Sequence, residues 1–191
     1  MPQRKHMKLV ILDRDGVINR DSSSFIKSPE EWVPIKGSLE AIAQLSQAGY
    51  EVVIITNQSG IGRGLFSADT LAKIHVRMID YVQQHGGKIQ SILFCPHHPD
   101  DDCTCRKPLP GMYQELAKRL NIDYSTVFSV GDSIRDLQAA EAAGAKPVLV
   151  KTGNGKKSLR RIENESEIGL SEVPVFTNLA AFTDALLKQE I

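Results

Sequence analysis

The sequence predicts an α/β fold built on a doubly wound, mostly parallel sheet. Short apolar runs typical of buried strands alternate along the chain with longer segments of helical period. The first apolar run ends in two carboxylates, Asp13 and Asp15, followed by Gly16, and open α/β sheets place their ligand crevice at the carboxyl ends of strands. The length of 191 residues suits one domain, which we expect to span residues 1–191.

Six apolar runs predict the strands, at residues 8–12, 51–56, 90–94, 126–130, 147–151 and 173–176. The first is apolar from Leu9 to Leu12 and the second from Val52 to Ile55, which is typical of strands that a parallel sheet buries on both faces. The remaining runs are short, rich in aliphatic or aromatic residues, and bounded by polar residues, Gly or Pro.

Helical segments lie between these runs, over residues 38–48, 68–85, 111–120, 134–143 and 179–188. Asn178 precedes the last of them and is a residue type that caps helix N-termini. Residues 152–169 are rich in Gly, Lys, Arg, Glu and Ser and have little apolar periodicity. This stretch therefore predicts a surface loop with room for one short helix.

The charges of the chain balance, because 23 Lys and Arg face 23 Asp and Glu. This argues against the broad positive surface that binds nucleic acid or an anionic membrane. Residues 1–7 are polar and charged, and no apolar run approaches the ~20 residues of a membrane span. We therefore expect a cytoplasmic protein with no membrane or nucleic-acid partner, and a monomer because no heptad repeat is present.

Asp13 and Asp15 are the first candidates for chemistry. In an extended chain, residues i and i+2 point to the same side, so both carboxylates would face one small volume. Like charges held that close favour a bound cation, and carboxylate oxygens suit Mg²⁺. The alternative, on this spacing alone, is a strand end with two solvated acids.

Polar residues also follow later strands. Residues 56–64 read Thr-Asn-Gln-Ser-Gly-Ile-Gly-Arg-Gly, whose hydroxyls and backbone amides are anion donors at a strand-to-helix turn. Asp132 follows the fourth strand, with Asp136 one turn into the next helix, and is either a cation ligand or a helix N-cap. Lys107 supplies a point charge suited to phosphate.

Four motifs occur in order along the chain: Asp-x-Asp-Gly after the first strand, Thr after the second, Lys before a later helix and Gly-Asp-x-x-x-Asp after the fourth. Together they resemble the motifs of the haloacid dehalogenase superfamily of phosphatases. The resemblance covers about residues 8–150 and implies the Rossmann-like fold of that superfamily. No long insertion separates the strands, so we expect no large cap domain and only the loops at residues 19–34, 60–67 and 95–105 over the crevice.

The resemblance also implies a role for each residue. Asp13 would be the nucleophile that takes up the phosphoryl group as an aspartyl phosphate, and Asp15 the general acid and base. Thr56 and Lys107 would hold the oxygens of the transferring phosphoryl group. Mg²⁺ would be held by Asp13, the backbone carbonyl of Asp15, and Asp132, with Asp136 just beyond these ligands.

All three cysteines and two of the five histidines fall within residues 95–105. In a reducing compartment this clustering favours a metal over a disulfide, and Cys103 and Cys105 are poorly spaced to bridge each other. Three thiolates and one imidazole make a closed tetrahedral Zn²⁺ site, which is structural because it leaves no open position. The alternative is a reduced loop without metal.

This loop precedes Arg106 and Lys107 and resembles the zinc-bearing branch of the superfamily, which includes heptose bisphosphate and histidinol phosphate phosphatases. The resemblance implies that the zinc ligands are Cys95, His97, Cys103 and Cys105. Zinc would then pin the loop and position Arg106 and Lys107 at the crevice.

Residues 56–64 resemble the D-glycero-D-manno-heptose 1,7-bisphosphate 7-phosphatases. The resemblance implies Mg²⁺-dependent removal of the 7-phosphate from that phosphorylated sugar, in the synthesis of nucleotide-heptose precursors of lipopolysaccharide core. The implied substrate contacts are Asp21, Ser24, Asn57, Gln58, Ser59, Arg63, Arg106, Lys107 and Ser133. Arg63 would serve the second phosphate, whereas Ser133 stands where a heptose enzyme carries a lysine.

Two other functions stay open on the sequence. A histidinol phosphate phosphatase would offer acidic groups to an aminoalcohol cation and have little need of Arg63. A non-catalytic scaffold that binds a phosphosugar would keep the fold and the zinc loop but lose a catalytic acid. Both Asp13 and Asp15 are present, which favours an active enzyme.

Overall fold

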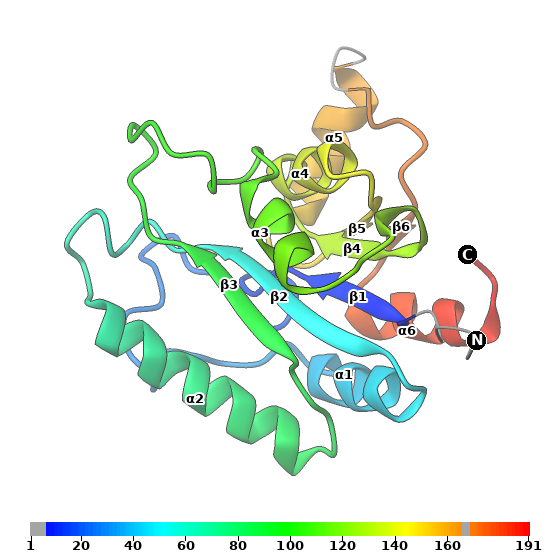
Figure 1. Cartoon of the computed structure of the whole chain (residues 1–191), viewed down its shortest axis with the longest axis horizontal. Coiled ribbons are helices and arrows are strands. Elements are labelled where there is room, and N and C mark those ends of the chain that lie inside the picture. The colour runs from blue at the N-terminus through cyan, green and yellow to red at the C-terminus, as the bar shows by residue number, and fades with distance from the viewer. Residues whose placement is uncertain (1–6, 166–168) are drawn as a thin grey trace.

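The computed structural model describes residues 7–165 and 169–191. Its centre is a six-stranded parallel sheet with the strand order β3-β2-β1-β4-β5-β6 (Figure 1). The strands are β1 Leu9–Leu12, β2 Glu51–Asn57, β3 Ser91–Cys95, β4 Phe128–Gly131, β5 Lys146–Val150 and β6 Val175–Phe176. The sheet is therefore the parallel, doubly wound type that the sequence predicts.

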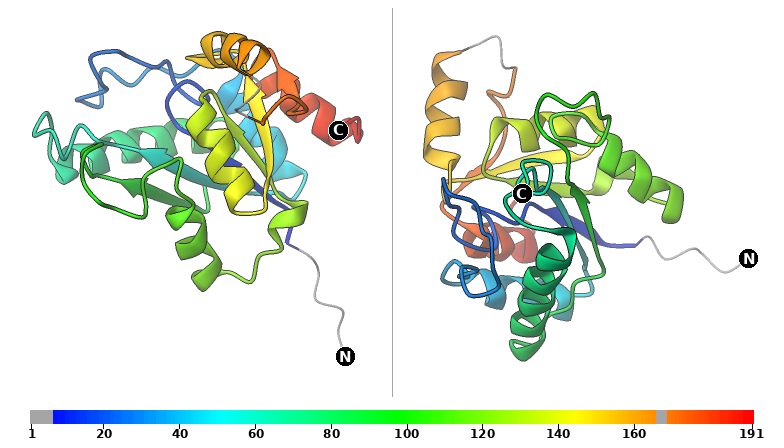
Figure 2. Two further views of the ribbon diagram at one scale, coloured as in Figure 1. Left: turned by 90° about the horizontal axis from the view of Figure 1, so that it is seen from above. Right: turned by 90° about the vertical axis from the view of Figure 1, so that its left-hand side faces the viewer.

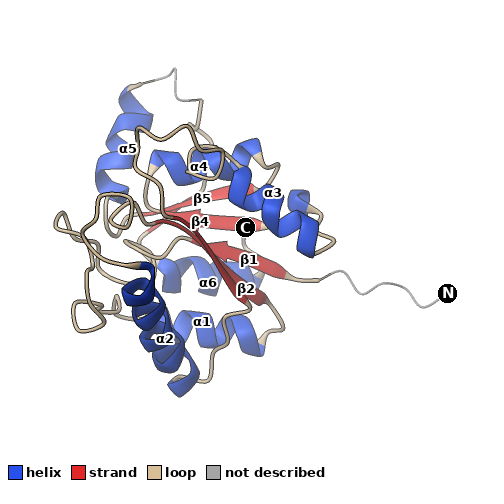
Figure 3. Cartoon of the chain, turned by 60° about the vertical axis from the view of Figure 1, so that its left-hand side comes forward, coloured by secondary structure: helices blue, strands red, loops and turns tan. Residues whose placement is uncertain are grey.

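Helices cover both faces of the sheet (Figure 3). They are α1 Ser38–Gln47, α2 Ala68–Gln84, α3 Gly111–Arg119, α4 Ile134–Ala142, α5 Gly155–Asn164 and α6 Leu179–Lys188, with a 3-10 turn η1 at Tyr124–Thr126. Val10 and Leu12 of β1 belong to the core shared with α1, α2 and α6, whereas Leu9 and Ile11 belong to the core shared with α3 and α4. This alternation explains why the first strand is apolar at every position.

The predicted elements differ from the observed ones mainly at their ends. Asn178 caps α6 as predicted, since its side chain accepts a hydrogen bond of 2.9 Å from the backbone N–H of Ala181. Residues 152–169, predicted as a surface loop with room for a short helix, carry the ten-residue helix α5. Its apolar signal is sparse because it is anchored mainly by Ile162, in a small core with Leu149 of β5. Residues 166–168 of that prediction lie outside the described residues.

The crevice lies where the winding of the sheet reverses. The chain runs from β1 through β2 to β3 and then crosses back, so that β4 pairs with the other side of β1. The backbone N–H of Asp13 donates to the carbonyl of Val130 at 2.9 Å, which brings the ends of β1 and β4 together. In open α/β sheets this switch point is where ligands bind.

Loops, rather than an inserted domain, surround the crevice. The right-hand view of Figure 2 looks onto the side of the molecule where the loops after β1, β2 and β3 lie. The loop at residues 19–34 is anchored by Trp32, which is buried in the core and packs edge to face with Tyr81 with centroids 5.7 Å apart. No helix in the described part of the chain is long and apolar enough to cross a membrane.

Candidate active site

A small cavity of about 80 Å³ opens at the carboxyl ends of β1, β2 and β4. Its walls carry carboxylates, hydroxyls, amides and two cations. The lining residues are Asp13, Asp15, Asp21, Thr56, Asn57, Lys107, Asp132, Ser133, Arg135, Asp136 and Asn154. The structure thus brings together the predicted nucleophile, acid and base, phosphoryl contacts and magnesium ligands, which are far apart in the sequence.

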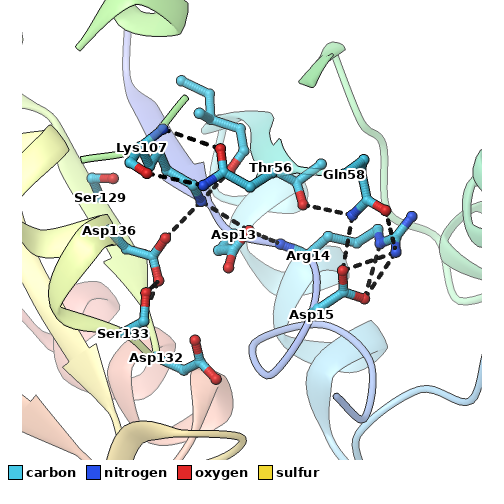
Figure 4. Close-up of polar contacts among 12 residues, drawn as sticks. Asp13, Arg14, Asp15, Thr56, Gln58, Lys107, Ser129, Asp132, Ser133 and Asp136 are labelled. Atoms are coloured by element: carbon cyan, nitrogen blue, oxygen red, sulfur yellow. Dashed lines mark hydrogen bonds and ion pairs between the residues drawn. The ribbon is translucent and has the colours of Figure 1, made fainter. Parts of the chain in front are cut away.

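Lys107 is a buried cation that lies between Asp13 and Asp136 (Figure 4). Its Nζ lies 3.0 Å from Oδ1 of Asp13 and 2.6 Å from Oδ1 of Asp136, and donates to the carbonyl of Ile55 at 2.7 Å. The backbone N–H and carbonyl of Lys107 both bond the side-chain amide of Asn57 at 3.1 Å. The end of β2 therefore fixes both the backbone and the ammonium of this residue.

Burial and repulsion between neighbouring charges raise the pKa values of two carboxylates in this cavity. Burial raises the pKa of Asp13 to about 7, and the charge of Asp136 adds to this effect. Burial likewise raises the pKa of Asp132 to about 8, with Asp136 and Asp13 contributing. Burial also disfavours the charge of Asp136, but Lys107 and hydrogen bonds from Ser133 hold its pKa below the usual value. One ammonium among three buried carboxylates leaves the cavity short of positive charge.

The position of Asp132 depends on two loops. Its carboxylate accepts a hydrogen bond of 2.7 Å from the backbone N–H of Asn154, whose side-chain amide donates to Asp21 at 2.7 Å. Gly16 and Gly153 press against the same carboxylate, and a Cβ at either position would collide with it. Both glycines have positive φ, which other residues rarely adopt. Asp132 is therefore not the helix N-cap considered above, because Ser133 occupies that position before α4.

The donor set fits a divalent cation. Asp13, Asp132 and Asp136 each offer a carboxylate oxygen, and these oxygens lie within 4.8 Å of one another. Both oxygens of Asp136 are already engaged, one by Lys107 at 2.6 Å and the other by the N–H and hydroxyl of Ser133 at 3.0 and 2.7 Å. Asp13 and Asp132 are less committed and are better placed to ligate. A divalent ion would supply the missing positive charge with ligands that Mg²⁺ prefers.

Asp15 lies in a separate group of hydrogen-bond donors, on the other side of Asp13 in Figure 4. Its Oδ1 accepts from Nε of Arg14 at 3.1 Å and from the amide of Asn19 at 2.8 Å, and its Oδ2 accepts from Nη2 of Arg14 at 2.8 Å and the amide of Gln58 at 2.9 Å. The extended-strand argument for Asp13 and Asp15 was only partly right. Both line one cavity, but β1 ends at Leu12 and each carboxylate has its own partners.

A second cavity of about 310 Å³ adjoins the first and shares Asp15, Asp21, Asn57 and Arg135 with it. It is lined by all three loops that were expected over the crevice. Its cations are Arg14, Arg63, Arg106 and Arg135. Within the described ranges, no carboxylate forms an ion pair with the last three of these.

The pKa of Arg106 is lowered by burial and by the neighbouring positive charges. Burial lowers the pKa of its guanidinium, and the charges of Arg135 and Arg63 lower it further. Its Nη1 atom is buried and has no hydrogen-bond partner among the residues that the structure describes. An unpaired buried donor beside two other guanidiniums is what an anion would satisfy.

The predicted substrate contacts divide between the cavities. Gln58, Ser59, Arg63 and Arg106 line the larger one, and Ser133 and Lys107 the smaller. Asp21 and Asn57 line both, although the Asn57 amide is already occupied by the Lys107 backbone. Ser24 is exposed and lines neither cavity.

Sequence reasoning missed two residues that the structure places in the site, Arg135 and Asn154, and assigned no role to the side chain of Arg14. The extended-strand argument concerned only the two carboxylates on either side of Arg14, so it left this side chain without a role. Asn154 was passed over because its segment was assigned to a surface loop. The short Gly-Asn-Gly turn at residues 153–155 was an available signal, since glycines next to an amide allow the backbone to approach a ligand or a carboxylate closely.

The cysteine and histidine cluster has the geometry of a metal site. Cys95 Sγ lies 3.7 Å from Cys103 Sγ, and Nδ1 of His97 lies 3.5 Å from Cys95 Sγ and 3.2 Å from Cys105 Sγ. Ligands held tetrahedrally about 2.3 Å from zinc are separated by roughly 3.8 Å, whereas a disulfide requires about 2.05 Å. Burial raises the pKa of the Cys95 thiol to about 12, and a bound zinc would reverse this by stabilising the thiolate. The cluster therefore fits zinc.

The zinc loop is bonded to the loop after β2. The carbonyl of Cys95 accepts from the N–H of Gln58 at 2.7 Å, and the carbonyl of Pro96 accepts from the N–H of Gly62 at 2.9 Å. A Cβ on Gly62 would lie 2.6 Å from the backbone N of His98, so the two loops pack backbone to backbone. The loop that carries the cysteine and histidine cluster thus supports Gln58, which contacts Asp15.

Comparison with known proteins gives a consistent result. Residues 104–173 match the family model for HAD-hydrolase-like proteins. A Bordetella bronchiseptica protein named D-glycero-beta-D-manno-heptose-1,7-bisphosphate 7-phosphatase is 53% identical over 184 residues, covering 96% of this chain and 99% of that protein. A Pseudomonas putida protein of the same name is 50% identical over 181 residues, covering 95% of this chain and 100% of its own.

Solved structures agree. The D,D-heptose 1,7-bisphosphate phosphatase of B. bronchiseptica, complexed with magnesium and phosphate, superposes with a TM-score of 0.90 at 53% identity over 96% of this chain and 99% of that one. The L-2-haloacid dehalogenase of Xanthobacter autotrophicus has a TM-score of 0.61 at 11% identity over 95% and 98% of the two chains, and so shares the fold. This chain belongs to the D-glycero-β-D-manno-heptose-1,7-bisphosphate 7-phosphatase family of the haloacid dehalogenase superfamily.

Proposed function

We propose that the protein is a Mg²⁺-dependent phosphatase that removes the 7-phosphate of D-glycero-β-D-manno-heptose 1,7-bisphosphate. The observation that carries the proposal is the pair of adjoining cavities, which suits a substrate with two phosphates. One cavity holds Asp13 and Lys107, and the other holds three guanidiniums without carboxylate partners in the described chain. Membership of the family supports the choice of sugar, and the names of the relatives supply the β anomer.

In the first half-reaction, Asp13 attacks the phosphorus atom of the 7-phosphate. Both hydrogen bonds to its side chain fall on Oδ1, from Lys107 Nζ at 3.0 Å and the Arg14 backbone N–H at 2.8 Å, which leaves Oδ2 as the attacking oxygen. The bond between phosphorus and the sugar oxygen breaks, and that oxygen takes its proton from Asp15. The products are the free 7-hydroxyl and an aspartyl phosphate.

In the second half-reaction, a water molecule attacks the aspartyl phosphate and gives its proton to Asp15. The bond between phosphorus and Asp13 breaks, which releases inorganic phosphate and restores both carboxyl groups to their starting states. Thr56 and Lys107 donate to the phosphoryl oxygens throughout. The Thr56 hydroxyl accepts from the Gln58 amide at 3.0 Å, so its own proton is free to be donated to phosphate.

Magnesium completes this charge arrangement. The proposed ligands are Asp13, the backbone carbonyl of Asp15, and Asp132, with Asp136 orienting Lys107 behind them. Mg²⁺ bound there offsets the charge of the phosphate and of the carboxylate that must approach it. Zn²⁺ at Cys95, His97, Cys103 and Cys105 has a structural role, since a site with four protein ligands has no open position.

The second phosphate belongs in the cavity of about 310 Å³, against Arg63, Arg106 and Arg135. Guanidiniums bind phosphate with paired hydrogen bonds, and the unpartnered Nη1 of Arg106 is such a donor. Arg135 lines both cavities and supplies the positive charge that Ser133 does not. A monophosphate such as histidinol phosphate would leave these guanidiniums unpaired.

The cellular setting follows from the same chemistry. We place the enzyme in the cytoplasm, where thiols stay reduced and can ligate zinc. We also expect residues 1–191 to form one domain and to act as a monomer on a small substrate. Because the net charge is zero, we expect no nucleic-acid partner. Light scattering on a size-exclusion column tests the monomer.

The deciding experiment is to measure kcat/KM for phosphate release with Mg²⁺ from four compounds on one preparation. These are the α and β anomers of heptose 1,7-bisphosphate, heptose 7-phosphate and histidinol phosphate. We expect the β bisphosphate to exceed the two monophosphates by about 10- to 150-fold, because loss of one buried charge-assisted contact costs roughly 1.5–3 kcal/mol. Phosphorus coupling to the anomeric proton of the product shows whether the 1-phosphate remains.

Other outcomes would replace the proposal. A preference for histidinol phosphate would reassign the substrate, and retention of the 7-phosphate would reverse the orientation in the two cavities. No phosphate release with or without Mg²⁺ would favour a binding scaffold. The matched variant Arg106→Met should lower kcat/KM for the bisphosphate and leave heptose 7-phosphate within about threefold of the wild type.

A further inference from the structure

Arg14 and His75 form a buried pair beneath the Asp15 carboxylate. Arg14 has a relative exposure of 1% and is among the largest fully buried side chains of the protein. His75 lies on α2 and is 8% exposed. An arginine buried to this degree is uncommon unless it is fully paired, so its partners indicate what it does.

The partners of Arg14 converge on Asp15. Its Nε and Nη2 donate to the carboxylate at distances of 2.8–3.1 Å, and Nη2 also donates to Oε1 of Gln58 at 3.1 Å. Gln58 in turn donates to Asp15 through its amide at 2.9 Å. The remaining terminal nitrogen, Nη1, lies 3.4 Å from Nε2 of His75. In the described chain, Asp15 is the only carboxylate that forms an ion pair with Arg14.

His75 can only accept in this contact. Burial lowers its pKa to about 4, and the charge of Arg14 contributes to that shift. The neutral imidazole therefore presents a lone pair on Nε2 to the guanidinium, since both groups would otherwise be donors. The ring also packs edge to face with Phe94 on β3, with centroids 6.0 Å apart.

We propose that Arg14, seated by His75, is the positioning residue that aims the Asp15 carboxyl at the leaving-group oxygen. The proposal rests on the function proposed above, in which Asp15 acts as acid and then as base. A carboxyl used twice in one cycle must return to the same place, although its proton and its hydrogen bonds change. Donors at the ends of β1 and β2, with Arg14 itself held by the acceptor His75 in the middle of α2, provide that fixed place.

The leaving group separates this role from a merely structural one. A sugar alkoxide is a poor leaving group and needs the proton of Asp15, whereas 4-nitrophenolate leaves without one. If the pair only supported the fold, its loss would slow both substrates alike. If it positions Asp15, its loss slows the first half-reaction with the sugar phosphate and spares it with the nitrophenyl ester.

The experiment measures the first turnover of the full-length magnesium enzyme by rapid mixing, with heptose bisphosphate and with 4-nitrophenyl phosphate. We expect His75→Phe to slow the sugar reaction by about 10- to 100-fold, a part of the 10²–10⁴ that general acid–base catalysis contributes. The first turnover of the nitrophenyl ester should stay within about threefold of the wild type. A nitrophenolate burst should then appear, because hydrolysis of the aspartyl phosphate still needs Asp15 as base.

Three variants serve as controls. His75→Gln keeps an acceptor and should recover most of the sugar rate, and Asp15→Asn sets the largest leaving-group effect that can be expected. Arg14→Lys keeps the positive charge but loses the paired donors of the guanidinium. It should slow the sugar reaction and spare the nitrophenyl ester, and it replaces His75→Phe if that variant does not fold.

Equal losses on both substrates, or no loss on either, would overturn the positioning role. The sugar can be replaced by any alkyl phosphate that the wild type hydrolyses. An incorrect substrate assignment would therefore appear in the wild type alone and would not be confused with failure of this inference.

Discussion

Asp13 and Asp15 are two residues apart and line one cavity, but their surroundings are opposite. Asp13 shares Lys107 with Asp136, and burial raises its pKa to about 7. Asp15 receives donors from Arg14, Asn19 and Gln58 on both of its oxygens. On one side of the cavity a single ammonium faces three carboxylates, whereas the other side is rich in hydrogen-bond donors.

This difference suits two tasks. A nucleophile must be left with an uncommitted oxygen, and its charge must be offset by a cation that can also bind the phosphate. A group that gives up and takes back a proton must instead be held in place by neutral and cationic donors while its own charge changes. The contrast teaches that the Asp-x-Asp spacing specifies where the acids lie, whereas residues elsewhere in the chain give them different properties.

The largest expected effect comes from removing one carboxylate at a time. Asp13→Asn should abolish turnover, by at least about 10⁴-fold in kcat, because no other group on that side can form the phosphoenzyme. Asp15→Asn should lower kcat for the sugar phosphate by about 10²- to 10⁴-fold, the contribution of general acid–base catalysis. Steady-state phosphate release measures both losses.

Calorimetric titration with substrate provides the control for Asp13→Asn. Binding should remain and should depend on Mg²⁺, because Asp132, Lys107 and the arginines are intact. Turnover by Asp13→Asn comparable to that of Asp15→Asn would contradict the division of tasks between the two carboxylates. So would a complete loss of binding in a folded protein.

The next effect concerns the loop that leads to Lys107. Cys103→Ser should lower the zinc content of the purified protein and reduce kcat, although Cys103 lines neither cavity. Loss of about 2–3 kcal/mol of stability would lower Tm by roughly 5–10 °C in a chain of this size. Metal analysis and thermal unfolding measure these changes.

His98→Ala is the matched control, since His98 lies in the same loop but interacts with Asp100 at 3.3 Å and not with the cysteines. It should keep the zinc content and activity of the wild type. A wild-type protein purified without chelator that contains no zinc would remove the basis of this prediction.

Much of the fold could be predicted from sequence, because its signals are local. Strands buried on both faces are apolar at each position, as in Leu9–Leu12, and helices such as Ala68–Gln84 repeat their apolar residues at the helical period. The acids at the ends of β1 and β4 could be placed in one crevice, since parallel strands end at the same edge of a sheet. The cluster of three cysteines and His97 could be predicted because its residues are rare and close in sequence.

The parts that could not be predicted depend on contacts across the chain. The Gly-Asn-Gly turn at residues 153–155 indicates a close backbone approach but does not indicate that its partner is Asp132, 22 residues away, because packing against Gly16 positions the turn. The role of the Arg14 side chain could not be predicted, because β1 ends at Leu12 and the contacts of Arg14 with Gln58 and His75 come from other elements. Helix α5 was underestimated because its buried face is narrow.

The smallest expected effect is a change in the pH dependence of unfolding free energy, which tests the His75 and Arg14 pair beside Asp15. The pKa of His75 is about 4 in the folded protein, against about 6.5 in an unfolded chain, so the unfolded state binds the proton first as the pH falls. Stability from this residue is complete above pH ~6.5 and is lost between there and pH ~4, at about 1.4 kcal/mol per unit. Between pH 7 and 5 the wild type should therefore lose about 2 kcal/mol that His75→Gln does not lose.

Urea unfolding of both proteins at the two pH values measures the difference, and the opposite contributions of Asp13 and Asp132 cancel because both proteins contain them. Parallel stability curves would show that His75 is not held neutral against Arg14, and the surroundings of Asp15 would then differ less from those of Asp13 than the hydrogen bonds indicate.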